Sequence, residues 1–292
     1  MNREGLNSNS IKNPKVSVIT LTRGRLNLLK RALDSVAHQD FEYLIEHVVV
    51  VDDDVDTFNY LNKVRYQMRQ NITIVFVGRS FSEAENSSSS FLSSRAYVYP
   101  RLSLLFNIGV QVASAEKISF LDDDNEYCPN HISSLFSMAQ EKQLQAVHSG
   151  RLVMNENGSP YLEERFPGVS DANKSKEIFA KMCDKGIWVK GTNILMDHTS
   201  TKVSNFNNST KSSEFDEVFL VDQNVWLLDR KLLLKFPIPE SYSAEDIANN
   251  LCPDDKLLET LLKNNVPIHS SNLATVKYYL GGISTAKAEG VL

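Results

Sequence analysis

Two apolar strands that each end in three consecutive aspartates constrain this chain most. Residues 47–51 form an unbroken apolar run, as in a strand covered on both faces, and Asp52, Asp53 and Asp54 follow directly. Residues 117–121 form a second such strand, which is followed by 122–124, again all aspartate. In open α/β sheets, ligands bind at the carboxyl ends of the strands. Clustered carboxylates repel one another, and a bound divalent cation is a common reason to keep them together. For each triplet alone, a solvated turn with helix-capping acids is the other interpretation.

Helical segments alternate with these strands. Periodicity predicts strands over 15–21 and 72–77 and helices over 25–38, 57–69 and 101–113. This β-α-β-α-β order predicts an α/β fold with a mostly parallel sheet and right-handed crossovers. A further helix is expected over 129–142. The alternation ends after Gln143, where the expected strands are 146–154, 186–195, 218–221, 266–269 and 274–279, and the expected helices are 230–234 and 254–264.

The chain divides into three parts on this basis. Residues 1–14 are polar and expected to be a disordered tail. Residues 15–142 form the α/β half, whose strand ends are the expected ligand site. Residues 143–292 form a mixed α+β half on the same sheet. Two polar stretches, 80–94 and 199–213, are rich in serine and asparagine and are expected to be loops over the site.

Composition excludes several function classes. Thirty-one basic and 36 acidic residues give a net charge of −5, which argues against a nucleic-acid binder. No run approaches the roughly 18–20 apolar residues that span a bilayer, and the N-terminus lacks the apolar core of a secretory signal. Cys128, Cys183 and Cys252 are far apart, which fits reduced thiols in a cytoplasmic protein better than a disulfide framework.

Three segments together resemble the family 2 glycosyltransferases that have the GT-A fold. Residues 16–23 are similar to the opening strand of that family. Residues 50–53 are similar to its second strand, which ends in V-D-D. Residues 101–107 and 118–125 are similar to its helix and its "DxD" strand, and Asn125, Tyr127 and Pro129 fit the D-D-N-x-Y-x-P form of some members. The resemblance covers about 15–135 and weakens beyond.

The resemblance implies a nucleotide-sugar donor, most often a UDP-sugar, and Mn²⁺ or Mg²⁺ as cofactor. It also implies that residues 15–142 bind the nucleotide-sugar and that residues 143–292 are the acceptor half, which binds the acceptor and carries the catalytic base. It places Thr20 near the nucleoside, and Asp53 at the imide proton of the uracil. Thr22 and Arg23 belong to the same nucleotide site, and Arg101 approaches the base or a phosphate. Asp122 or Asp123 contacts the ribose, and Asp124 binds the metal. Arg25 supplies positive charge nearby.

Transfer with inversion needs a base that takes the proton of the acceptor hydroxyl. The resemblance places it at the start of a late helix, where Asp254 and Asp255 stand. Plain N-terminal capping is the alternative for these two acids, and Glu245-Asp246 is the rival pair for the base. Aromatic and acidic side chains of the second half are candidates for acceptor binding; they are Trp188, Trp226, Tyr242 and Asp222.

The sequence therefore predicts an inverting, metal-assisted glycosyltransferase that acts on a saccharide or glycoconjugate acceptor, in bacterial polysaccharide biosynthesis. We expect it in the cytoplasm, with a peripheral contact at the inner face of the membrane if the acceptor is lipid-linked. A sugar-phosphate nucleotidyltransferase is one alternative, although its Gly-rich basic loop is represented only by residues 22–25. A non-catalytic nucleotide-sugar-binding module is the other.

Overall fold

The computed structural model describes residues 13–68, 71–80, 94–167, 169–197 and 220–281. Most of the expected tail (1–14) and most of the two serine-rich stretches (80–94 and 199–213) lie outside these residues, and so does most of the strand expected over 218–221. None of the described helices is long and apolar enough to cross a membrane.

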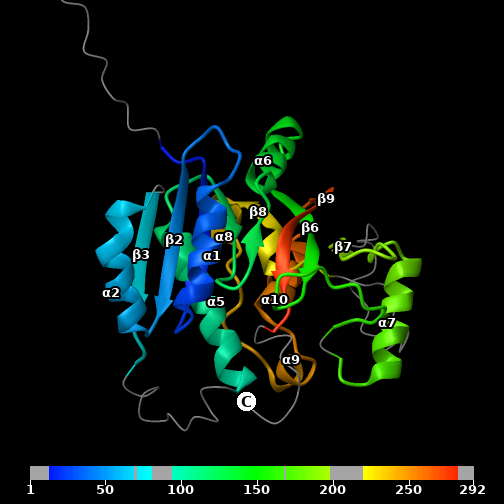
Figure 1. The fold of residues 1–292 in the computed structure, drawn as a ribbon. Helices are drawn as coiled ribbons and strands as arrows, with labels where there is room; N and C mark the ends of the chain where they lie inside the picture. The colour runs from blue at the N-terminus through cyan, green and yellow to red at the C-terminus, as the bar shows by residue number, and fades with distance from the viewer. Residues whose placement is uncertain (1–12, 69–70, 81–93, 168, 198–219, 282–292) are drawn as a thin grey trace, which may run out of the picture.

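One sheet runs through the described chain, in the order β3-β2-β1-β4-β8-β6-β9-β5, with β7 paired to β6. Strands β3, β2, β1 and β4 are parallel neighbours, whereas β8 is antiparallel to both β4 and β6 (Figure 1). The strands are β1 Val16–Thr22, β2 Ile45–Asp52, β3 Asn71–Val77, β4 Lys117–Phe120, β5 Glu126–Tyr127, β6 Ala146–Met154, β7 Ile194–Leu195, β8 Trp226–Asp229 and β9 Ile268–Tyr279.

Helices cover both faces of the parallel strands, because β2 is apolar on both sides. Val49 and Val51 pack in one cluster with side chains of α1 and α2, while Val48 and Val50 belong to the main core with α5. The run over 47–51 is therefore a strand covered on both faces, as predicted. The helices are α1 Leu26–Ala37, α2 Val55–Val64, α5 Arg95–Val112, α6 His131–Glu141, α7 Ala172–Asp184, α8 Arg230–Lys235, α9 Ala244–Ala248 and α10 Pro253–Lys263, with short 3-10 turns η1 Arg65–Gln67 and η3 Gln223–Val225.

The far edge of the sheet curls back toward the parallel half. Strand β5 follows the Asp122–Asp124 turn after only one residue and pairs with β9 rather than with β4. The hydroxyl of Tyr127 on β5 lies 2.8 Å from Ser119 Oγ and donates to the Phe120 carbonyl at 2.6 Å. This curl holds the second aspartate triplet between β4 and the C-terminal strand.

The predicted α/β fold is confirmed, but several element boundaries were wrong. The helix expected from Arg101 begins at Arg95 and runs through Pro100. The two strands expected over 266–269 and 274–279 form one strand, β9, in which Asn272 has a left-handed φ of 56°. The strand expected over 186–195 is a short hairpin in which Trp188 bridges Leu195.

Helix α7 was not predicted. Its buried side chains are only Ser175, Phe179 and Met182, so its apolar period is weak. Together with β7 and Trp188 it forms a second, smaller core beside β6, and Figure 1 shows it at the side of the molecule. The boundary at residue 142 stays a prediction, because the sheet is continuous across it.

Gly109 fixes how closely α5 approaches the sheet. A Cβ atom at this position would lie 2.6 Å from Cγ2 of the buried Ile19. We predict that Gly109→Ala lowers the free energy of unfolding by about 1–3 kcal/mol through overpacking, although alanine in an open helix site would add about 1 kcal/mol. Urea unfolding measures the change, and Gln111→Ala, an exposed position of the same helix, is the control. A stabilised Gly109→Ala would show that α5 can move away.

Candidate active site

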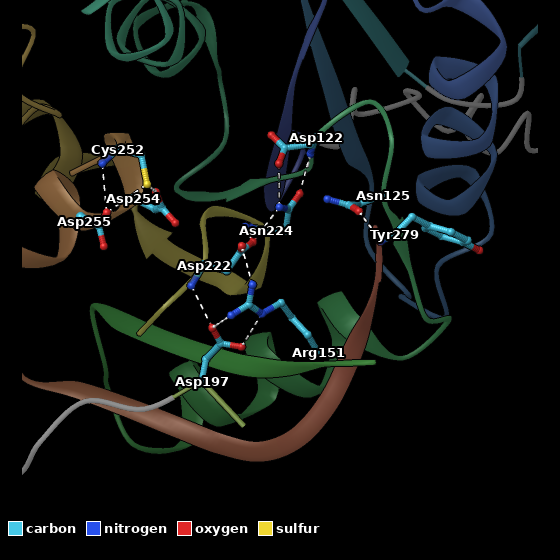
Figure 2. A network of polar contacts seen from close by, with 10 residues as sticks. All are labelled: Asp122, Asn125, Arg151, Asp197, Asp222, Asn224, Cys252, Asp254, Asp255 and Tyr279. Atoms are coloured by element: carbon cyan, nitrogen blue, oxygen red, sulfur yellow. Dashed lines mark hydrogen bonds and ion pairs between the residues drawn. The ribbon is translucent and has the colours of Figure 1, made fainter. Parts of the chain in front are cut away.

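Four groups of polar side chains lie near the carboxyl ends of the parallel strands or face them from the other half. They are the triplet after β2, the triplet after β4, the segment Asp222–Asn224 before β8, and the start of α10. Figure 2 shows the last three together, with Asp122 above, Asp222 and Asn224 in the middle, and Asp254 to one side.

The first triplet has three different environments. Asp52 Oδ1 accepts hydrogen bonds from Arg101 Nε and Nη2, at 3.0 and 2.8 Å. The same guanidinium donates to the Val77 and Gly78 carbonyls. Arg101 is only 7% exposed, and these contacts connect α5 to the ends of β2 and β3. Its predicted contact with a nucleotide stays a prediction.

Asp53 and Asp54 differ in what they offer to a ligand. Asp54 caps α2 and accepts from Thr57 N at 3.1 Å and Gly24 N at 2.7 Å. Burial raises the pKa of Asp54, but these hydrogen bonds outweigh it and hold the pKa below its usual value. Asp53 has a left-handed φ of 50° and an ion pair with Arg79 at 3.7 Å, and its side chain is 37% exposed. Asp54 is thus a capping residue, whereas Asp53 is accessible.

The three predicted nucleotide-binding residues in and just after β1 differ in their exposure to solvent. Thr20 is buried, and its hydroxyl lies 2.9 Å from His47 Nε2 inside the sheet. Thr22 is buried at the end of β1, and Arg23 is exposed just beyond it. Arg23 is therefore accessible at this edge, and its predicted nucleotide contact stays a prediction. The roles predicted for Thr20 and Thr22 stay predictions.

Arg25 pairs with two of the three carboxylates of the second triplet. Its guanidinium pairs with Asp123 through Nη2 and donates to Asp124 Oδ2 at 2.8 Å through Nη1. Burial raises the pKa of Asp123 to about 6, against the attraction of Arg25. Arg31 adds a hydrogen bond to the backbone carbonyl of Asp124. The protein itself thus supplies a cation to the two carboxylates that the sequence assigned to ribose and metal.

Asp122 turns the other way and contacts Asn224. The Asp122 backbone N–H donates to Asn224 Oδ1 at 2.6 Å, and Asn224 Nδ2 donates to Asp122 Oδ2 at 2.8 Å. Burial raises the pKa of Asp122 well above its usual value, and the nearby charges of Asp124 and Asp222 raise it further. Negative charge is therefore only partly compensated at this point.

Asp222 continues this contact into the second half of the chain. Its Oδ1 accepts from Asn224 Nδ2 at 2.7 Å, and its Oδ2 accepts from Arg151 Nη1 at 2.7 Å. Arg151, on β6, also pairs with Asp197 through Nε at 3.0 Å and Nη2 at 2.9 Å. Burial, opposed by Arg151, raises the pKa of Asp197 to about 7.

The two candidate bases at the start of α10 differ in their contacts. Asp255 Oδ2 accepts the backbone N–H of Cys252 at 3.0 Å, which closes a capping box. The Cys252 thiol lies 2.7 Å from Asp254 Oδ1 and 3.0 Å from Asp255 Oδ2. Burial raises the pKa of Asp254 to about 7, with further contributions from Asp255 and Asp222. The capping interpretation thus fits Asp255, and a titratable base fits Asp254.

The rival pair Glu245-Asp246 has a structural role. Asp246 forms a capping box with Ser243 at the start of α9 and an ion pair with Lys256 at 3.1 Å. Hydrogen bonds, led by the Ser243 backbone N–H, lower the pKa of Asp246. A carboxylate held in this way is a weak proton acceptor.

Among the acceptor candidates, the two tryptophans were wrong. Trp188 and Trp226 are 1% and 0% exposed, so neither presents a ring face to a sugar. Tyr242 lies 2.9 Å from Ser103 Oγ and beside the ring of Tyr99. Sequence reasoning missed Asn224, Arg151 and Asp197, because their contacts join positions up to 102 residues apart. The only local signal was the polar triplet 222–224 directly before an apolar strand.

Comparison with known proteins bears on the fold. No protein-family model matches the chain. A curated relative is the GalNAc(5)-diNAcBac-PP-undecaprenol beta-1,3-glucosyltransferase of Campylobacter jejuni, 27% identical over 169 residues, which are 58% of this chain and 47% of the relative. The chain thus spans about half the length of that relative.

Solved structures of two glycosyltransferases resemble the fold. TarS 1–349 of S. aureus has a TM-score of 0.52 at 18% identity, over 91% of this chain and 60% of that one. The mannosyltransferase PcManGT of Pyrobaculum calidifontis, in complex with GDP-Man and Mn²⁺, has a TM-score of 0.50 at 12% identity, over 96% of this chain and 59% of that one. The chain has the GT-A fold, and its resemblance to glycosyltransferases, stated from the sequence, is confirmed.

The charge of Arg25 can be tested through stability. In Arg25→Gln the fully buried Asp123 loses its cation, so its pKa rises above the present value of about 6. When folding raises the pKa of an acid, the folded protein becomes less stable as the pH increases from the unfolded-state pKa of that acid through its folded-state pKa. We predict a decrease in the free energy of unfolding of about 1–3 kcal/mol at pH 8 and a smaller one at pH 5, where Asp123 is protonated in both proteins.

Urea unfolding at the two pH values gives the comparison. Arg23→Gln, the same change at an exposed position two residues away, is the control and should have little effect at either pH. An Arg25→Gln effect that is equal at pH 5 and pH 8 would contradict the assigned ion pair.

Proposed function

We propose that this protein is a glycosyltransferase that moves a sugar from a nucleotide-diphospho-sugar to an acceptor hydroxyl with inversion, assisted by a divalent cation. The observation that carries the proposal is that three sets of carboxylates lie in one region of a GT-A fold, where Arg25, Asn224 and Asp222 connect them. Two sets follow parallel strands, and the third, at α10, belongs to the half that would hold the acceptor.

The donor site lies along the ends of β1, β2 and β4. Asp53 is exposed and can accept the imide proton of a uracil, and Arg23 can reach a phosphate. Asp122 has one carboxylate oxygen, Oδ1, that accepts no hydrogen bond from the described residues, which suits it to a ribose hydroxyl. TarS 1–349 has been solved with UDP and with UDP-GlcNAc, which supports a UDP-sugar as the donor.

The second triplet is the proposed site of the divalent cation. Its ligands are carboxylate oxygens, which Mn²⁺ and Mg²⁺ prefer. The raised pKa values of Asp122 and Asp123 reflect burial and crowded negative charge, which a cation would relieve. Asp124 would hold the cation once Arg25 moves aside. Bound there, the metal would act as a Lewis acid on the diphosphate oxygens of the leaving group. The complex of PcManGT with GDP-Man and Mn²⁺ supports divalent metal use.

Asp254 is the proposed general base. A pKa of about 7 lets it take up a proton near neutral pH and release it again. Its position on α10 faces the network of Asp222 in Figure 2, so an acceptor hydroxyl between the two halves would lie within reach.

The proposed acceptor is a saccharide or glycoconjugate. The name of the C. jejuni relative describes a saccharide joined to undecaprenol through a diphosphate. A similar acceptor would bring this protein to the inner face of the bacterial membrane as a peripheral enzyme of polysaccharide synthesis. Detection of UDP, rather than pyrophosphate, as the product separates this function from a sugar-phosphate nucleotidyltransferase. UDP-sugar binding without any UDP release would favour a non-catalytic binding module.

Removal of the proposed metal ligand tests the donor site. We predict that Asp124→Ala abolishes the increase in melting temperature that UDP with Mn²⁺ produces, because ligand binding stabilises only the native state. Asp184→Ala, an acid at the end of α7, is the control and should keep the increase. An Asp124→Ala protein that retains the full Mn²⁺-dependent shift would contradict the metal assignment.

Separate substitutions at α10 test the base. We predict that Asp254→Asn lowers kcat about 10²-fold or more while UDP affinity is kept, and that Asp255→Asn, which removes only a cap, changes kcat by less than about tenfold. In the unsubstituted enzyme, kcat/KM should rise with pH through about 7, because the base must be ionised. The reverse order of the two variants would move the role to Asp255, and full turnover in both would exclude α10.

A further inference from the structure

A chain of five polar residues connects the second half of the protein to the donor edge. It runs from Asp197 and Arg151 through Asp222 and Asn224 to Asp122 (Figure 2). Arg151, Asp197 and Asn224 are almost completely buried, at 5%, 2% and 1% exposure. These residues come from β6, from the segments that end at 197 and begin again at 220, and from the turn after β4.

Asn224 can adopt only one amide orientation in this chain. Its Nδ2 donates to two carboxylates, Asp122 Oδ2 at 2.8 Å and Asp222 Oδ1 at 2.7 Å, which uses both of its protons. Its Oδ1 accepts the Asp122 backbone N–H at 2.6 Å. A flipped amide would place its oxygen against two carboxylates. The side chain therefore fixes both the backbone and one carboxylate oxygen of Asp122.

Asp222 is held in turn from the opposite side. Its Oδ2 accepts from Arg151, and its backbone N–H donates to Asp197 Oδ1 at 2.9 Å. Its Oδ1 accepts both the backbone N–H and the side-chain amide of Asn224, at 2.9 and 2.7 Å. The Asp222 carboxylate has no freedom to turn away from Asn224 while Arg151 stays in place.

Stability does not explain why these charges are buried. Hydrophobic residues of similar volume usually serve a protein core as well as a buried ion pair or better. Here one arginine is buried with two aspartates, and one of them, Asp222, contacts both Arg151 and the Asn224 amide. A role in orienting a functional side chain explains such an arrangement better than stability does.

We propose that Asn224 is a positioning residue for Asp122, and that the buried pair of Arg151 and Asp222 holds Asn224 in place. Asp122 then presents Oδ1 to the donor while Oδ2 is fixed by the amide. This inference rests on the proposed function, because it assigns Asp122 to the nucleotide. It also means that residues of the acceptor half determine the geometry of the donor site.

A double-mutant cycle tests the proposal. Asn224→Ala and Asp122→Asn are made singly and together, and the affinity for UDP with Mn²⁺ is measured by titration calorimetry. If Asn224 acts through Asp122, Asn224→Ala weakens UDP binding about tenfold to a hundredfold, as expected for loss of hydrogen bonds to a charged group. The same substitution in Asp122→Asn should then cost less than about twofold, because the group it positions is already lost.

Two further variants keep the test interpretable if Asn224→Ala folds poorly. Arg151→Lys retains the charge but loses the bidentate contacts of the guanidinium. It should weaken UDP binding less than Asn224→Ala does, and it should not weaken UDP binding when it is combined with Asp122→Asn. Asn193→Ala removes a side-chain hydrogen bond to the Val153 carbonyl in the smaller core, and it should leave UDP affinity unchanged. Melting temperatures of all variants report the folding contribution separately.

The outcomes separate this inference from the function beneath it. If Asn224→Ala weakens UDP binding by the same factor in the unsubstituted protein and in the Asp122→Asn variant, the positioning role is overturned and the proposed function is not affected. A protein without substitutions that binds neither UDP nor GDP in the presence of Mn²⁺ would overturn both.

Discussion

Repulsion between carboxylates at one edge of a sheet is the constraint on which the rest of this structure depends. The fold ends β2 and β4 in aspartates, and it brings Asp222 and Asp254 toward them from the second half. Arginines compensate this charge in part: Arg101 at Asp52, Arg79 at Asp53, and Arg25 at Asp123 and Asp124. In the proposed function, the remaining negative charge would be compensated by a ligand that brings cations with it, such as a diphosphate with a divalent metal.

The continuous sheet explains how the two halves cooperate. Strand β8 lies between β4 and β6, so the segment Asp222–Asn224 reaches Asp122 after β4, while Arg151 on β6 contacts Asp222 from the other side. The curl through β5 and β9 fixes the same turn from its other side, where Asn125 accepts the backbone N–H of Tyr279 at 3.0 Å. The aspartates after β4 are therefore held by both halves of the protein.

The sequence predicts the parallel half well, because an apolar run such as 47–51 depends only on local pattern and burial. It also predicts which edge carries the acids, since strand direction follows from the alternation with helices. It does not predict that Arg25 lies between Asp123 and Asp124, or that Asn224 contacts Asp122, because nothing local specifies contacts between positions 99 or 102 residues apart. Helix α7 was missed for a different reason, which is that a helix burying only three side chains has little apolar period to detect.

The position of manganese in crystals grown with UDP and Mn²⁺ tests the central claim most directly. The account predicts an anomalous peak between Asp124 and the diphosphate, with Arg25 displaced from Asp124 and the uracil beside Asp53. Cys252, Asp254 and Asp255, at the start of α10, form a group whose ligand atoms lie within 4.8 Å of one another. A peak at that group, or a nucleotide bound away from both aspartate triplets, would contradict the account.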